Sequence, residues 1–100
     1  MQILYEEKDN GFIGLSWEPT LKVWILHIDC KVWSKETYKR YKEIGEMIKD
    51  ELKKKGITEV YGLSETPKEV KFNRMFGGEV LPYIVYDTDG KPNYLVKGVL

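Results

Sequence analysis

Apolar and polar positions alternate along the chain with two periods, and they divide it into strands and helices. Ile3–Tyr5 and Phe12–Trp17 flank Asp9-Asn10-Gly11, which is a turn signal because asparagine and glycine tolerate the positive φ of tight hairpins. The pattern predicts a β-hairpin here. Pro19 then interrupts it, since proline has no N–H for a continuing strand.

The segment from Lys22 to Val32 is apolar on both faces. Its two alternating sets are Val23, Ile25 and His27 on one face, and Trp24, Leu26, Ile28 and Cys30 on the other. A two-sided run of this kind is typical of a central strand that is covered above and below. We predict that this strand lies in the middle of a sheet.

A long amphipathic helix is predicted from Ser34 to Lys55. Ser34 is a suitable N-cap, Glu36 favours the helix start, and Gly56 supplies a left-handed stop. Apolar residues at spacings of three and four form its inner face, and these are Tyr38, Tyr41, Ile44, Ile48 and Leu52. Met47 is expected to widen this apolar face.

The remaining segments complete an alternation of strands and helices. Ile57–Leu63 is a short strand after the long helix, a spacing that suits a right-handed parallel crossover. Thr66-Pro67 predicts the start of a second, shorter helix, which Gly77-Gly78 ends.

A second hairpin closes the predicted order. Glu79–Tyr86 and Tyr94–Val99 read as strands around Asp89-Gly90. The order β-β-β-α-β-α-β-β predicts one α/β domain over residues 1–100, with helices packed on a mixed sheet. One hundred residues suffice for a single hydrophobic core.

Composition narrows the partners and the compartment. Sixteen basic and sixteen acidic residues cancel, which argues against a nucleic-acid or membrane-surface partner. Cys30 is the only cysteine, so no intramolecular disulfide can form and a reducing compartment fits best. No segment approaches the roughly 20 apolar residues of a membrane span, and no signal sequence is recognisable. We expect a soluble, cytoplasmic protein.

His27 is the only histidine and therefore the first candidate for a general base, with Asp29 on the same strand face. The alternative is a hydrogen-bonded strand residue. His27 and Cys30 fall on opposite faces, which excludes a shared metal ion, and we predict no metal site. Cys30 is either a nucleophile or a core thiol, and Glu18 and Ser64 are either bases or caps near strand ends.

Aromatic side chains are abundant, with three tryptophans, seven tyrosines and three phenylalanines. A domain of this size cannot bury all of them. An exposed aromatic cluster would indicate a protein-binding surface, whereas base stacking on single-stranded nucleic acid is disfavoured by the lack of a net basic charge. We therefore expect a protein partner. The closing strands could also pair with a second copy to form a homo-oligomer.

The order of elements, together with Thr66–Gly78 (TPKEVKFNRMFGG), resembles the GNAT (Gcn5-related N-acetyltransferase) superfamily, and particularly small GNAT-like proteins of tailed phages. The segment is similar to the family helix pattern Asn-x-x-Ala-x-x-Phe-Tyr-x-x-x-Gly-Phe. Phe72 and Gly77 match it. Four positions depart from it: Thr66, Glu69 and Gly78, and Asn73, which stands where many members have the tyrosine that protonates the leaving thiolate.

The resemblance also implies where a coenzyme would bind. GNAT enzymes have an Arg/Gln-x-x-Gly-x-Gly/Ala loop whose amides hold the coenzyme pyrophosphate at a helix start. Here the turn from Lys31 to Thr37 has no glycine and contains Trp33. The implied contacts for acetyl-CoA are Ser34, Lys35, Glu36, Thr37 and Asn73. Full-length members have helices before the first hairpin, and the resemblance leads us to expect no counterpart of them here.

Two functional hypotheses follow from these features. In the first, the chain is a phage-type GNAT-like domain that binds a protein, in the virion or as an inhibitor in the host cytoplasm, without efficient catalysis and without a cofactor. In the second, it is an acyl-CoA-dependent N-acyltransferase with a reduced coenzyme loop. In this case His27 and Asp29 would activate the amine, and acetyl-CoA would be the donor.

Overall fold

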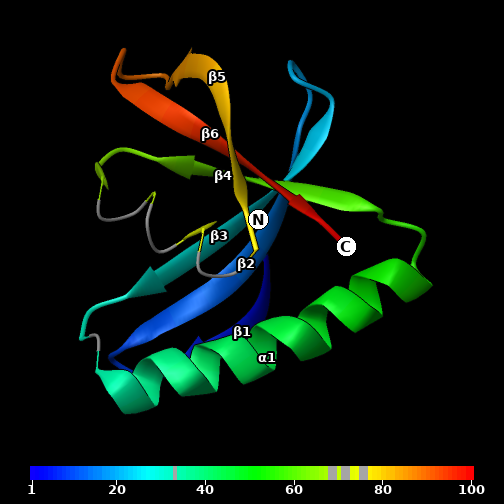
Figure 1. The fold of residues 1–100 in the computed structure, drawn as a ribbon, viewed down its shortest axis with the longest axis vertical. Coiled ribbons are helices and arrows are strands. Elements are labelled where there is room, and N and C mark those ends of the chain that lie inside the picture. Colours follow the sequence, from blue (N-terminus) through cyan, green and yellow to red (C-terminus); the bar gives the residue numbers. More distant parts are fainter. Residues whose placement is uncertain (33, 68–69, 71–72, 75–76) are drawn as a thin grey trace.

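The computed structural model describes residues 1–32, 34–67, 70, 73–74 and 77–100. A six-stranded mixed sheet forms the body of the molecule, and helix α1 runs along one of its faces (Figure 1). The elements are β1 (Gln2–Glu7), β2 (Gly11–Glu18), β3 (Val23–Cys30), α1 (Lys35–Lys54), β4 (Glu59–Ser64), β5 (Glu79–Tyr86) and β6 (Pro92–Val99). Across the sheet the strand order is β1-β2-β3-β4-β6-β5.

The first three strands form an antiparallel meander, as the turn signals predicted. β2 pairs with β3 without interruption from Gly11↔Cys30 to Glu18↔Val23. In the first turn the positive φ falls on Asp9, at 62°. β3 lies between β2 and β4, which confirms the central position expected from its two apolar faces.

Helix α1 begins and ends as predicted. The Ser34 side chain caps its first turn, and Gly56 has a φ of 85° after the last one. Tyr41 and Leu52 are buried, but Met47 is 68% exposed, so the prediction that Met47 widens the inner face was wrong. Each residue turns an α-helix by about 100°, which carries Met47 away from Ile48 and past the contact with the sheet.

The core between α1 and the sheet consists of two adjoining clusters. The buried members of the first cluster are Ile13, Cys30 and Tyr41, and those of the second are Leu15, Leu52 and Val60. Every strand residue in these clusters lies on the face of the sheet that α1 covers. Ile48 packs against both clusters, so the helix and the middle of the sheet share one continuous core.

The crossover from β3 through α1 to β4 is parallel, as predicted. These two strands pair at a single position, Ile25↔Tyr61, and then diverge toward their carboxyl ends (Figure 1). β4 continues the sheet by pairing along its whole length with β6. The sheet therefore has a gap between the carboxyl ends of β3 and β4, while β4 stays hydrogen-bonded to β6 along its whole length.

The closing hairpin of β5 and β6 confirms the Asp89-Gly90 turn signal, with a φ of 78° at Gly90. The register shifts between Val80 and Ile84, around Pro82, which has no N–H to donate. β1 and β5 are the two edge strands.

The predicted second helix is not matched among the described elements, which run β-β-β-α-β-β-β. Residues 68–69, 71–72 and 75–76 of this segment lie outside the described part, so Glu69 and Phe72 of the family-like pattern do too, as does Trp33 in the turn before α1. Within the segment, the Val70 N–H donates to the Thr66 carbonyl at 3.0 Å, a helical spacing. No helix in the described part of the chain is long and apolar enough to cross a membrane.

Candidate functional site

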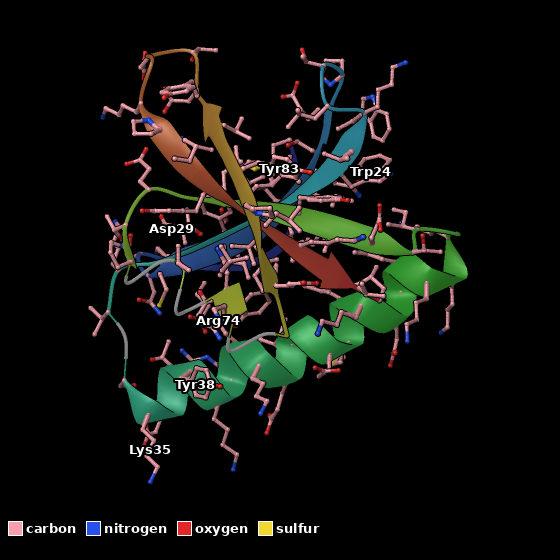
Figure 2. The ribbon with its side chains drawn as sticks, turned by 45° about the horizontal axis from the view of Figure 1, so that its top comes forward. Trp24, Asp29, Lys35, Tyr38, Arg74 and Tyr83 are labelled. Carbon is pink, nitrogen blue, oxygen red and sulfur yellow. The ribbon has the colours of Figure 1, made fainter. Side chains whose placement is uncertain are left out.

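A cleft of about 200 Å³ lies where β3 and β4 diverge. We use "the cleft" for this space, whose described lining is Phe12, Leu26, His27, Ile28, Asp29, Leu63 and Asn73. Both faces of β3 contribute, because the loss of pairing with β4 exposes its edge as well as its side chains. Figure 2 shows Asp29 on β3 and Arg74 in the segment that follows β4. His27, Asp29 and Asn73 supply the polar chemistry of the cleft.

His27 is held by Ser16 of the neighbouring strand. Its Nε2 lies 2.7 Å from Ser16 Oγ, across the β2–β3 pair. Burial lowers the pKa of the imidazole below its ordinary value, and the N-terminal ammonium lowers it further. The ring is therefore neutral near pH 7, which is the form that a general base needs.

His27 takes its hydrogen-bond partner from the neighbouring strand and not from Asp29, which shares its strand face. No hydrogen bond within the described residues joins Asp29 to His27, and Asp29 is exposed at the end of β3. Both residues still line the cleft. Sequence analysis missed Ser16. The alternation of side chains along β2 could have indicated it. Gly14 pairs with His27, and Ser16, two residues further along β2, therefore lies on the same face of the sheet as His27.

Asn73 is fixed in the cleft by Ser64 at the end of β4. Its Nδ2 donates to Ser64 Oγ at 2.6 Å, and Ser64 is fully buried. Gly62 leaves room for this amide, because a Cβ there would lie 3.2 Å from Asn73 Nδ2. Ser64 therefore acts by positioning Asn73, and the buried hydroxyl does not reach the cleft as a base.

The start of α1 is organised as a cap. Ser34 Oγ accepts the Thr37 N–H at 3.1 Å and lies 2.9 Å from Thr37 Oγ1, so this amide already has an acceptor within the chain. Lys35 and Glu36 are exposed, and Figure 2 shows Lys35 pointing away from the sheet. None of these four residues belongs to the described lining of the cleft. Their role in binding a pyrophosphate stays a prediction.

Cys30 lies on the opposite face from His27, as the alternation predicted. Its Sγ donates to the Val32 carbonyl at 3.2 Å, and burial raises the pKa of the thiol. A buried, protonated thiol is a poor nucleophile. Glu18 acts as a turn cap, since its Oε1 accepts the Thr20 N–H at 2.9 Å. Among the residues that the structure describes, no three histidine, cysteine or acidic side chains come together to hold a metal ion.

Exposed aromatic and aliphatic side chains gather on the closing hairpin. Ile84 pairs with Tyr94 across β5 and β6, and Tyr86 follows on the same face; all three are exposed, Tyr86 by 68%. We call these three residues the hairpin patch. Tyr83, 63% exposed, stands beside them on the edge strand. Trp17 and Trp24 form a separate edge-to-face pair on β2 and β3.

Comparison with known proteins places this arrangement among acetyltransferase folds. No protein-family model and no curated protein matches the sequence. A solved structure titled "aminoglycoside 6'-acetyltransferase type Ii" is similar, with a TM-score of 0.66 and 17% identity. The match covers 94% of this chain and 64% of that one, so the chain spans less than two thirds of the length of this structural neighbour. At this level of identity the likeness establishes the fold alone: the chain has a GNAT-like mixed α/β fold.

Proposed function

We propose that the protein transfers an acyl group from an acyl-CoA thioester to an amine in the cleft between β3 and β4. The observation that carries this proposal is the divergence of the two strands after Ile25↔Tyr61, which exposes His27 and Asn73 to one cavity. The GNAT-like fold supports it, since the similar structure is named as an acetyltransferase.

In this reaction the amine attacks the carbonyl carbon of the thioester. The new C–N bond forms, the C–S bond breaks, and the coenzyme leaves as a thiolate that takes up a proton. The proton that the amine loses passes to His27 or to a water that His27 holds. Neutral His27 is suited to this role, and Ser16 fixes its ring through Nε2.

Asn73 would stabilise the leaving thiolate of the coenzyme by a hydrogen bond. Its amide has two N–H bonds, and one of them is occupied by Ser64. The other can donate to the thioester sulfur or to the departing thiolate. Because an amide cannot give up its proton, the thiolate takes its proton from solvent or from His27 after His27 has accepted the amine's proton. This differs from the acid role that the family resemblance assigns to a tyrosine at this position.

Isothermal titration with acetyl-CoA tests the proposal. Binding in the low micromolar range that weakens at least tenfold in Asn73→Ala would support it, and no heat of binding at millimolar coenzyme would overturn it. Tyr83→Ala is the matched control, since Tyr83 lies on the edge strand β5 and outside the described lining of the cleft. A Lys35→Glu variant tests separately whether the start of α1 holds the pyrophosphate.

A second candidate function is protein binding without catalysis, and the hairpin patch favours it. Ile84, Tyr86 and Tyr94 expose aromatic and aliphatic surface on an edge hairpin, and aromatic residues anchor protein interfaces at low entropic cost. β5 also has a free edge that can add a strand from a partner or from a second copy. A virion or host protein of a phage would be such a partner.

The two functions are separated by one pair of variants. Tyr86→Ser with Ile84→Ser should abolish co-purification of a partner and leave acetyl-CoA titration unchanged if the patch binds protein. Asn73→Ala should leave that partner bound. Sedimentation of the purified chain reports a homo-oligomer in the same experiment, and a monomer with no partner from host lysate would contradict the binding function.

A further inference from the structure

A second cavity, of about 60 Å³, lies between α1 and the sheet and adjoins the cleft. We call it the inner cavity. Leu26, Ile28 and Asn73 line both spaces, so the two share one wall that includes Asn73. Apart from Asn73, Lys49 is the only polar side chain in its described lining, and it pairs with Glu46 at 3.5 Å. The rest of the lining is apolar or glycine, which suits an apolar ligand group.

The inner cavity exists because backbone without side chains meets there from several elements. Its lining includes four glycines: Gly45 in α1, Gly62 in β4, Gly78 immediately before β5, and Gly98 in β6. A Cβ on Gly78 would lie 2.4 Å from the Val96 side chain, and one on Gly98 would lie 3.6 Å from Val60 Cγ2. Glycine inside a strand weakens the strand, and one reason to keep it is the close approach of a ligand.

The volume limits what the inner cavity can hold. A water molecule occupies about 30 Å³ of liquid, and a methylene or methyl group is of similar size. The space of about 60 Å³ therefore takes about two carbon groups. An acetyl group whose carbonyl lies beside Asn73 would leave most of it empty, while a long chain would not fit without moving the core.

We infer that the acyl donor carries a short chain of about four carbons, whose last two groups occupy the inner cavity while the thioester lies in the cleft. This inference rests on the proposed acyl transfer and names its donor class. Each buried methylene strengthens binding about fourfold, so butanoyl-CoA should bind about fifteenfold more tightly than acetyl-CoA. Octanoyl-CoA should not show this tighter binding, because its chain is too long for the inner cavity.

Titration of the full chain with free CoA, acetyl-CoA, butanoyl-CoA and octanoyl-CoA tests the inference. A maximum at butanoyl-CoA is the expected result. Equal affinities for acetyl- and butanoyl-CoA, or affinity that keeps rising to octanoyl-CoA, would overturn the inference and leave acyl transfer standing. No binding of any thioester would remove the proposed function itself, so the two failures differ.

A variant series locates the chain in the protein. Gly98→Ala adds one methyl group at ordinary contact distance and should cut the butanoyl advantage to about fourfold or less, with acetyl-CoA affinity unchanged. Val99→Ala, at the exposed neighbour, is the matched control and should keep the full advantage. An undiminished advantage in Gly98→Ala would place the chain elsewhere. The wild-type series decides the donor class even if Gly98→Ala does not fold.

Discussion

Arg40 on α1 and Glu7 on β1 form a bidentate ion pair that ties the helix to the edge of the sheet. Arg40 Nη2 donates to Glu7 Oε1 at 3.0 Å, and Arg40 Nε donates to Oε2. The same carboxylate accepts from Tyr5 Oη at 2.8 Å and from Asn10 Nδ2 at 2.7 Å. One side chain thus joins β1, the first turn and the helix that follows β3. This contact stabilises the β1 edge of the sheet, and the opposite edge is β5, which pairs with β6.

Acid should weaken this connection within a defined range of pH. The Arg40 guanidinium holds the pKa of Glu7 at about 2, against an ordinary value of 4.5. A carboxylate with a lowered pKa in the folded state adds stability above its unfolded pKa, and this stability is lost as pH falls from about 4.5 toward 2. Thermal melts between pH 6 and pH 2 should show a steeper acid decline in the wild type than in Glu7→Gln.

A matched pair of charges provides the control for this prediction. Glu51 and Lys54 form an ion pair on the exposed face of α1, where solvent screens it. Glu51→Gln should therefore keep the wild-type acid profile. An identical decline in wild type and Glu7→Gln would show that the Glu7 carboxylate does not stabilise the fold.

Because His27 is the only histidine, its ring signals in an NMR spectrum need no assignment, and its pKa can be measured directly. Burial lowers the pKa of His27, so the unfolded chain binds its proton more readily than the folded one. Stability should then rise with pH up to about 6.5, the ordinary value, and stay level for this group above it. An NMR titration of the ring protons should give a pKa below 6.5. Replacement of Ser16 by alanine should shift the ring signals, because Nε2 loses its hydrogen-bond partner. A pKa above 6.5 in the wild type would contradict the burial of the ring.

Much of the fold could be predicted because local signals coincide with the tertiary arrangement. The two-sided apolar run at Val23–Cys30, the Ser34 cap and Gly56 each have one physical explanation, and the structure agrees with all three. Met47 shows the limit, since an apolar residue at the margin of a stripe is placed by the width of the sheet contact. The spacing of apolar residues along the helix does not predict how wide that contact is.

The candidate site was harder to predict from the sequence for a related reason. Strand parity placed Asp29 on the same face as His27, but the sequence indicated no hydrogen-bond partner for His27. Ser16 became the partner through the register of β2 against β3, which depends on a turn about four residues long. The inner cavity could not be foreseen either, because Gly45, Gly62, Gly78 and Gly98 are scattered along the sequence and meet only in the folded chain.

Core substitutions on α1 should separate its buried and exposed apolar residues. Leu52 is 3% exposed and packs in the cluster with Leu15 and Val60, so Leu52→Ala should lower the free energy of unfolding by about 3 kcal/mol. Met47→Ala, on the same helix, should change it by less than about 0.5 kcal/mol. Urea denaturation monitored by tryptophan fluorescence measures both. Similar losses in the two variants would mean that α1 presents a wider face to the core.

The hydrogen bond between Ser64 and Asn73 yields the last prediction, because it is the contact that fixes a cleft residue from inside the core. Ser64→Ala removes the acceptor of the Asn73 Nδ2 and should cost about 1 kcal/mol of stability. The side-chain amide protons of Asn73 should also lose their protection from exchange with water, which two-dimensional NMR detects directly. Thr88→Ala, in the exposed turn between β5 and β6, should change neither quantity. If Ser64→Ala lowers stability but leaves the Asn73 amide protected, another group holds Asn73, and Ser64 contributes only to packing. If both change together with a loss of thioester affinity, the buried hydroxyl sets the position of the amide in the cleft.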